Sequence, residues 1–201
     1  MRYQTKATLR MLKAILSTFA RAQVFTLGFI LSAVAADLSQ ISKLDGFISI
    51  QDTLSANAER PFECADYVEA SQSCAAVSKS QIDGNTLISA NKTLISEAPR
   101  IEVQIKATLE LAHGLACGTA ATWDIAVVGE GVNDEFEQGI INAVRASVGK
   151  FGKICIAYFE KGGLLQAVNF SAETGKVIEE IPITNTTFWD VAPKLRAAEQ
   201  S

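Results

Sequence analysis

The longest regular pattern of apolar and polar residues runs from Arg100 to Leu111. Six apolar side chains alternate there with polar ones, at positions Ile101, Val103, Ile105, Ala107, Leu109 and Leu111. Alternation with a period of two predicts a β-strand with one face in the core and the other in water. Such a strand belongs to an antiparallel sheet, because parallel strands are usually buried on both faces.

Shorter apolar runs bounded by turn residues predict the remaining strands. Asp83-Gly84 is a strong hairpin signal, and glycine-containing turns separate the later runs. The predicted strands are residues 62–67, 74–82, 85–90, 93–95, 123–128, 154–160, 164–170 and 176–183. Helical spacing of apolar residues over 38–44 adds a short helix before the strands.

One amphipathic helix is predicted between the two groups of strands, at about residues 133–148. Asn133 is a favourable N-cap residue, and the acids that follow it suit the positive end of the helix dipole. Its apolar stripe is Val132, Phe136, Ile140, Val144 and Val148. The pattern predicts an α+β fold: a single small domain in which antiparallel β-meanders pack on this one central helix.

The first 36 residues have the composition of an export signal. Residues 1–23 contain five basic residues and no acid, and an apolar run follows from Val24 to Val34. The run ends in small residues before Asp37, the first acid of the chain. We expect a signal peptide over 1–36, cleaved near Ala35 or Ala36. Residues 37–60 would then be a short helix and lead-in to a disulfide-stabilised domain over 61–201.

Three other interpretations of this N-terminal region remain open. Its amphipathic basic part is also typical of an organelle transit peptide. Retention of the whole segment would make it a membrane anchor, although its apolar run is shorter than the about 20 residues that cross a bilayer. Translation from Met11 instead of Met1 would give a signal of more usual length.

Loss of residues 1–36 would make the protein strongly acidic. The remaining 165 residues carry 13 basic and 22 acidic side chains, a net charge of about −9 against −4 for the whole chain. An acidic surface repels phosphate groups, so nucleic acid is not an expected partner. A membrane would be contacted only through an uncleaved signal, which leaves an unknown protein or a small ligand as the partner.

Four cysteines follow the predicted cleavage point: Cys64, Cys74, Cys117 and Cys155. An even number in an exported chain predicts two disulfides and a periplasmic or secreted location. Three pairings are possible. Cys64–Cys74 and Cys117–Cys155 are favoured, since each pair flanks one self-contained unit of the predicted structure.

Residues 127–134, Val-Val-Gly-Glu-Gly-Val-Asn-Asp, resemble the Gly-Asp-Gly-Val-Asn-Asp signature of P-type ATPases and their haloacid dehalogenase relatives. The resemblance implies a magnesium site. Glu130 stands where that family has aspartate, however, and the upstream nucleophilic aspartate motif of the family is absent. A glycine turn followed by a helix cap explains the same residues. The turn also resembles the Gly-x-Gly-x-x-Gly loop of dinucleotide-binding proteins, but Asp134 occupies the position of the third glycine, so we reject that interpretation.

No other pattern predicts a catalytic, cofactor or metal site. His113, the one histidine, would act with Cys117 in a thiol enzyme, but it follows a strand directly and a turn explains it. Phe188 and Trp189 would either pack in the core or cap an apolar ligand pocket between helix and sheet. We therefore expect an exported partner- or ligand-binding domain without enzymatic activity. The alternatives are an exported hydrolase or thiol enzyme using His113, and a membrane-anchored accessory subunit that retains residues 1–36.

Overall fold

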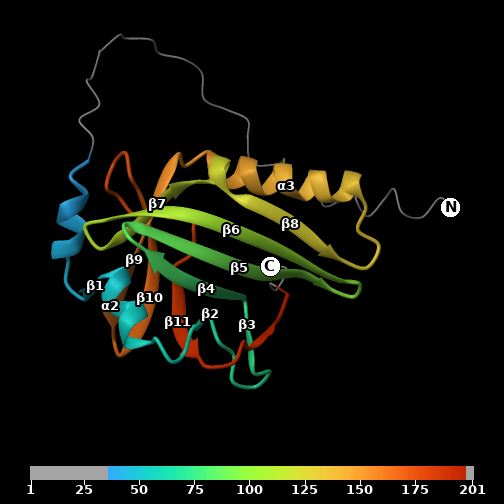
Figure 1. The fold of residues 1–201 in the computed structure, drawn as a ribbon, viewed down its shortest axis with the longest axis horizontal. Helices are drawn as coiled ribbons and strands as arrows, with labels where there is room; N and C mark the ends of the chain where they lie inside the picture. The colour runs from blue at the N-terminus through green and yellow to red at the C-terminus, as the bar shows by residue number, and fades with distance from the viewer. Residues whose placement is uncertain (1–35, 198–201) are drawn as a thin grey trace, which may run out of the picture. The chain divides into compact units, whose positions relative to one another are not determined.

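A computed structural model describes residues 36–197, which are built around a closed barrel of eight strands (Figure 1). The barrel strands are β2 (Phe62–Ala65), β4 (Ala76–Asp83), β5 (Thr86–Glu97), β6 (Arg100–Ala112), β7 (Leu115–Thr119), β9 (Lys153–Lys161), β10 (Leu164–Ser171) and β11 (Thr184–Trp189). Each strand pairs antiparallel with the next, and β11 pairs back with β2. The order in the barrel is thus the order in the chain, an up-and-down arrangement.

The other elements decorate this barrel. They are the 3-10 helices η1 (Leu38–Lys43) and η2 (Ala120–Thr122), the helices α2 (Ile50–Ala56) and α3 (Asp134–Gly149), and the strands β1 (Phe47–Ile48), β3 (Ser73–Cys74), β8 (Asp124–Gly129) and β12 (Lys194–Leu195). β1 pairs with β9, β8 extends the edge of β6 beyond β7, and β3 and β12 form a separate two-stranded sheet.

The predicted α+β arrangement of meanders packed on a central helix is wrong. The strands close on one another, so their side chains form the core without a helix at its centre. α3 instead packs through Ile141 against Val103, Ile125 and Val127, where β6 and β8 run past β7. Ile141 is the one buried residue of this helix, and Phe136 remains 38% exposed. Alternation in a strand reveals that one face is apolar but not whether another strand or a helix covers it.

Side chains on the two faces of the barrel wall form separate clusters. The inner cluster contains Ile50, Leu87, Ala107, Leu109, Leu111, Ala116 and Tyr158. The outer cluster contains Ile41, Leu115, Cys117, Cys155, Ala157, Val168 and Phe170, covered by Leu38 and Phe47. Residues 37–60 therefore pack as part of the same body: η1 covers the outer wall, and Ile50 of α2 packs into the interior.

Two disulfides reinforce this body, Cys64–Cys74 and Cys117–Cys155. Cys64–Cys74 ties β2 to β3, and its sulfurs are buried with Val77 and Trp189 nearby. Cys117 and Cys155 are direct partners of β7 and β9, with Cα atoms 4.0 Å apart. This second bond therefore lies on the seam that closes the barrel.

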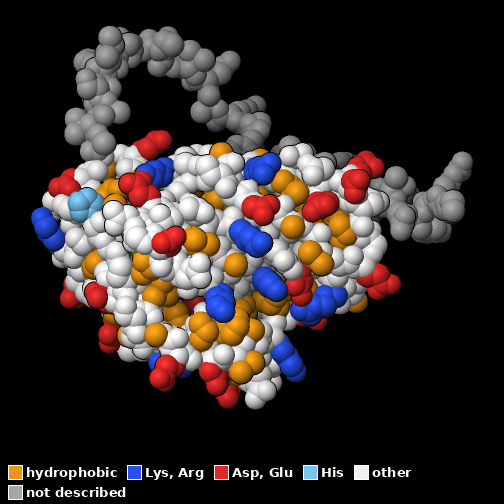
Figure 2. Space-filling view, viewed as in Figure 1, with side chains coloured by type: hydrophobic (Ala, Val, Ile, Leu, Met, Phe, Trp, Pro, Cys, Tyr) orange, Lys and Arg blue, Asp and Glu red, His pale blue; other side chains and the backbone are white. Residues whose placement is uncertain are grey.

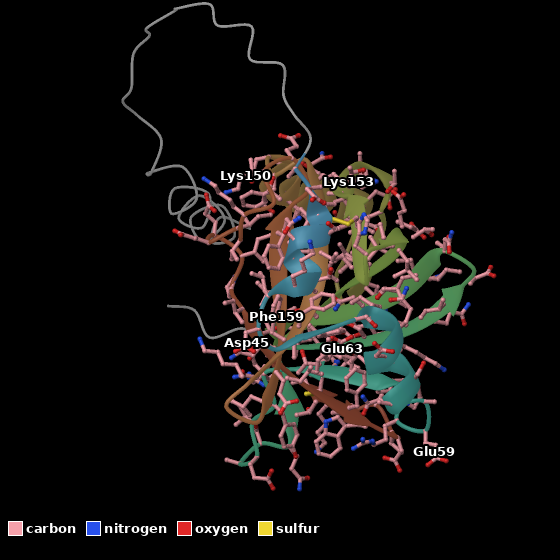
Figure 3. The ribbon with its side chains drawn as sticks, turned by 90° about the vertical axis from the view of Figure 1, so that its left-hand side faces the viewer. Asp45, Glu59, Glu63, Lys150, Lys153 and Phe159 are labelled. Carbon is pink, nitrogen blue, oxygen red and sulfur yellow. A yellow bond between two sulfur atoms is a disulfide. The ribbon has the colours of Figure 1, made fainter. Side chains whose placement is uncertain are left out.

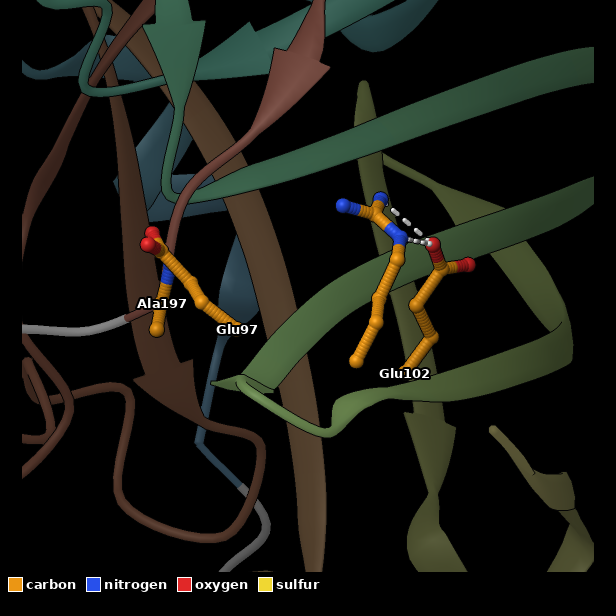
Figure 4. Close-up of polar contacts among 4 residues, drawn as sticks. Glu97, Glu102 and Ala197 are labelled. Atoms are coloured by element: carbon orange, nitrogen blue, oxygen red, sulfur yellow. Dashed lines mark hydrogen bonds and ion pairs between the residues drawn. The ribbon is translucent and has the colours of Figure 1, made fainter. Parts of the chain in front are cut away.

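The C-terminal residues of the described chain return to the β5–β6 hairpin (Figure 4). The backbone N–H of Ala197 donates to the Glu97 carboxylate at 3.3 Å, and a bridge between Ala197 and Leu94 covers that leucine. On the same hairpin, the Arg100 guanidinium forms an ion pair with Glu102 at 2.6 Å. The tail thus adds cover to the outer wall, where Leu94 is 1% exposed.

The predicted signal peptide, residues 1–36, lies outside the described residues except for Ala36. None of the helices formed by residues 36–197 is long and apolar enough to span a membrane. Figure 2 shows acidic, basic and apolar side chains interspersed over the side on which β4, β5 and β6 face the viewer. No patch of a single charge sign marks a binding site on that visible face of the described chain.

Candidate functional site

A cavity of about 580 Å³ opens at the end of the barrel beside α2. It is lined by Asn57, Arg60, Gly163, Leu165, Thr186, Thr187, Phe188, Trp189 and Asp190. These residues come from the chain that follows α2, from the β9–β10 turn, and from β10 and β11. The cavity is therefore a mouth of the barrel, with one helix end and one hairpin at its rim.

The floor of this cavity belongs to the inner wall. Leu165 of β10 is paired with Thr186 of β11, and Phe188 of β11 is paired with Glu63 of β2. Residues directly opposite each other in an antiparallel pair point to the same face. Leu165, Thr186, Phe188 and Glu63 therefore share one surface, which begins at the mouth and continues into the barrel.

Two threonine hydroxyls near the mouth are buried without a hydrogen-bond partner among the described residues. Thr186 is 5% exposed and lines the cavity floor. Thr53 of α2 is 4% exposed and lies one turn from Ile50, which packs in the inner cluster. Buried polar atoms in proteins nearly always have a protein or water partner. These two hydroxyls therefore need a partner, which a water molecule or a small molecule bound at the barrel end would supply.

A carboxyl group and a phenol meet inside the barrel. The Tyr158 hydroxyl and the Glu63 carboxyl group lie close enough to shift each other's pKa, and Figure 3 shows Glu63 among the barrel strands. β10 and β11 separate β2 from β9 along the wall, so the two side chains influence each other across the interior. Tyr158 is 4% exposed, and Glu63 is half-buried.

Burial controls the protonation of both groups. Removal from water raises the pKa of the Glu63 carboxyl above its ordinary 4.5, and the hydrogen bond from Tyr158 opposes part of that rise. Burial and the nearby carboxylate hold the pKa of Tyr158 well above 10.0, so its hydroxyl remains a donor. Neither of the two ion pairs found among residues 36–197 includes Glu63. When ionised, the Glu63 carboxylate therefore has no positive neighbour in ion-pair contact among these residues.

Small polar side chains extend this surface across β4 and β5. Ser78 is paired with Glu63 and accepts a hydrogen bond from the Asn91 amide at 2.9 Å. Two residues further along β4, the Ser80 hydroxyl donates a hydrogen bond to the Ser89 hydroxyl at 3.1 Å. One side of the interior is therefore polar, whereas the side formed by β6, β7 and β9 is mainly apolar.

The residues of the thiol-enzyme hypothesis do not form a site. His113 is exposed in the β6–β7 turn, where its backbone φ of 54° is of the left-handed type. Cys117 is bonded to Cys155 and has no free thiol. Across the described chain, no group of His, Cys, Asp or Glu side chains is arranged to hold a metal ion.

The glycine turn that resembles the P-type ATPase signature has a structural role. Gly131 has a φ of 76°, and the Asn133 carboxamide oxygen accepts a hydrogen bond from the Phe136 backbone N–H. Glu130 is exposed. The segment ends β8 and starts α3, as a turn and a cap would do.

The aromatic pair singled out in the sequence lies at the cavity. Phe188 and Trp189 line the barrel mouth, not a space between helix and sheet. Glu63, Tyr158, Thr53 and Thr186 were missed as site residues. For Glu63 a signal was present: an acid between Phe62 and Cys64 interrupts a short strand of otherwise apolar residues.

Comparison with known proteins adds no relative: no family model, curated protein or solved structure matches the chain.

Proposed function

We propose that the protein is an exported binding protein that holds a small molecule at the α2 end of its barrel. The observation that carries the proposal is the Thr186 hydroxyl, which lies on the floor of the cavity, is buried, and has no partner among the described residues. A molecule in the cavity would supply that partner. The exposed His113 and the oxidised Cys117 give no comparable support to a thiol enzyme.

The dimensions and lining of the cavity support a small-molecule ligand. Ligand sites commonly have volumes of roughly 300–1,000 Å³ and combine apolar walls with a few placed polar groups. Here the cavity of about 580 Å³ combines Leu165 and Phe188 with the hydroxyl of Thr186. The mouth of a small β-barrel is also a usual place for such a site.

Export is supported by the two buried disulfides together with the signal-like pattern of residues 1–36. Intact mass spectrometry of the protein isolated under oxidising conditions tests this part. Loss of residues 1–36 and of four hydrogens is the expected result. Retention of the whole N-terminus would favour the membrane-anchored alternative instead.

Ligand binding is tested by blocking the cavity. Leu165→Trp should fill it, while Leu164→Trp, at the adjacent and 51% exposed position, should leave it open. Ligand-observed NMR with a set of small fragments of different charge would then compare both variants with the unmodified protein. We expect fragment binding that Leu165→Trp abolishes and Leu164→Trp preserves.

A second variant tests the site independently, in case Leu165→Trp does not fold. Thr186→Val keeps the shape of the side chain and removes its unpartnered hydroxyl. It should fold at least as stably as the unmodified protein and bind hydrogen-bonding fragments more weakly. Equal fragment binding by all four proteins would contradict the proposed function.

A further inference from the structure

We infer that the ligand is a small organic amine, a protonated ammonium group on an apolar or aromatic body, with the ammonium bound to Glu63. This inference rests on the proposed function, since it assigns a chemical class to a molecule in the same barrel end. It is carried by a carboxyl group inside the barrel that has no positive partner among residues 36–197.

An ionised Glu63 would be a negative charge without a positive partner inside the barrel, as far as residues 36–197 are concerned. A carboxylate that is partly shielded from water, as Glu63 is, is stabilised by a cationic partner and by hydrogen bonds. Within the described chain, Glu63 has the Tyr158 hydroxyl as a neighbour but no cation in ion-pair contact. An ammonium group would complete the pair, whereas a second carboxylate or a phosphate would add repulsion.

Glu63 lies within reach of a molecule bound in the cavity. Glu63 of β2 lies directly opposite Phe188 of β11 in the strand pair, and Phe188 lines the cavity. Directly opposite side chains have Cβ atoms about 5 Å apart. A molecule lying against the Phe188 ring is therefore close enough to place a terminal group on the Glu63 carboxylate.

The barrel end offers hydrogen-bond acceptors to an ammonium group. An ammonium group has three N–H donors and accepts nothing. The Glu63 carboxylate accepts, and the unpartnered Thr186 hydroxyl on the same inner surface can accept a second bond. The unpartnered Thr53 hydroxyl on α2 offers a third acceptor near the same barrel end.

The lining of the cavity suits an apolar or aromatic body of the ligand. Phe188 and Leu165 line the cavity on the inner face, whereas Trp189 reaches its rim and packs beside the Cys64–Cys74 disulfide. Apolar and aromatic walls hold an apolar body by burial, and ring faces attract a cation. Arg60 and Asp190 both line the mouth and carry opposite charges, so the rim does not repel a cation as a whole. The net charge of about −9 expected for residues 37–201 would draw cations toward the protein.

Three probes of similar shape and different charge test the inference: 2-phenylethylamine, the neutral 2-phenylethanol and the anionic 3-phenylpropanoate. Their affinities for residues 37–201 in oxidised form would be measured by calorimetry or NMR titration at pH 7. We expect the amine to bind most tightly. Glu63→Gln should weaken amine binding at least about tenfold, the loss typical when one partner of a buried charge pair is removed.

Two controls make the result specific. Glu63→Gln should leave the affinity for 2-phenylethanol unchanged and should not lower the melting temperature, because it removes an unpaired charge. Glu69→Gln, at an exposed position, should leave amine affinity unchanged. A purely structural role of Glu63 would move the stability and both affinities together.

The outcomes separate this inference from the proposed function. If the alcohol or the carboxylate binds as tightly as the amine, or if Glu63→Gln keeps amine affinity, the ligand is not a cation held by Glu63, although a binding site exists. If no probe of any charge binds, the proposed function fails as well.

Discussion

Glu63 of β2 and Tyr158 of β9 influence each other's pKa across the interior of the barrel. They are 95 positions apart in the sequence, and two other strands separate them along the wall. Polar groups are rarely placed inside a small barrel unless they have partners there. This pair, together with the unpartnered hydroxyls of Thr53 and Thr186, distinguishes the α2 end of the barrel from an ordinary apolar core.

Replacement of Glu63 by glutamine is expected to stabilise the ligand-free protein. The substitution removes a charge without a cationic partner and retains an acceptor for the Tyr158 hydroxyl. We predict an increase of about 1 kcal/mol in the free energy of unfolding at pH 7, the order of magnitude of one unsatisfied buried group. Urea unfolding measures it, with Glu69→Gln as the exposed control. Destabilisation by Glu63→Gln alone would indicate a cationic partner for the carboxylate.

The stability difference between these two proteins should depend on pH. The pKa of Glu63 is raised in the folded state, so the folded protein keeps this proton to higher pH than the unfolded chain does. The stabilising contribution of the protonated group is therefore fully present below the ordinary value of 4.5 and is lost as pH rises through the folded-state pKa.

Urea unfolding of both proteins between pH 4 and pH 8 would show this difference, because titrations common to both cancel. Near pH 4 the two free energies of unfolding should nearly coincide, and the advantage of Glu63→Gln should grow as pH rises. An advantage that shrinks with rising pH would mean that the folded-state pKa of Glu63 is lowered.

Removal of the phenol oxygen tests the hydrogen bond itself. Tyr158→Phe keeps the ring in the inner cluster and takes the donor away from Glu63. We predict a loss of about 1–2 kcal/mol in the free energy of unfolding. The same substitution in the Glu63→Gln background should cost a different amount, since directly interacting residues are not additive. Strict additivity in the double-mutant cycle would show that the two side chains do not interact.

The disulfide between Cys117 and Cys155 should contribute more stability than that between Cys64 and Cys74. It closes a sequence separation of 38 residues against 10. In the chain-entropy model, loops of these lengths correspond to about 4 and about 3 kcal/mol. Paired cysteine-to-alanine variants, compared by urea unfolding, measure both values. The variant without Cys117–Cys155 should also bind more of an apolar dye than the variant without Cys64–Cys74, because the former bond joins the closing strands β7 and β9. A larger loss of stability on removal of Cys64–Cys74 would contradict the assignment of that seam.

Local patterns predicted several elements well. The alternating segment predicted as a strand over 100–111 is β6, Arg100–Ala112, and the helix predicted at about 133–148 is α3, Asp134–Gly149. In both, the periodicity extends over enough residues to identify the element. The break predicted near residues 91–92 does not occur, because β5 runs from Thr86 to Glu97 without interruption.

Other elements left no clear local pattern. β7, Leu115–Thr119, is five residues without alternation, and β11, Thr184–Trp189, is rich in polar residues. The strand predicted over 176–183 is mainly irregular, with an isolated bridge at Val177. Without β7 and β11 the closing pairs β7–β9 and β11–β2 could not be foreseen. The barrel therefore could not be predicted, and neither could the site that depends on it.

The site was hidden for the same reason. Glu63, Tyr158 and Thr186 lie far apart in the sequence and come together only when the barrel closes. Phe188 and Trp189 could be singled out as candidates, because two adjacent aromatic residues near a strand end are visible in the sequence. Their position at a barrel mouth follows from the long-range pairing of β11 with β2.

The central claim is that the α2 end of the barrel binds a small molecule, and amide chemical shifts of ¹⁵N-labelled protein test it most directly. During titration with 2-phenylethylamine, we predict saturable shifts at Leu165, Thr186 and Phe188 that Glu63→Gln weakens. Leu44, Val177 and Ile183, which line an apolar groove on the outer wall, should be unaffected. Shifts confined to that groove, or no saturable shifts at the barrel mouth, would contradict the account.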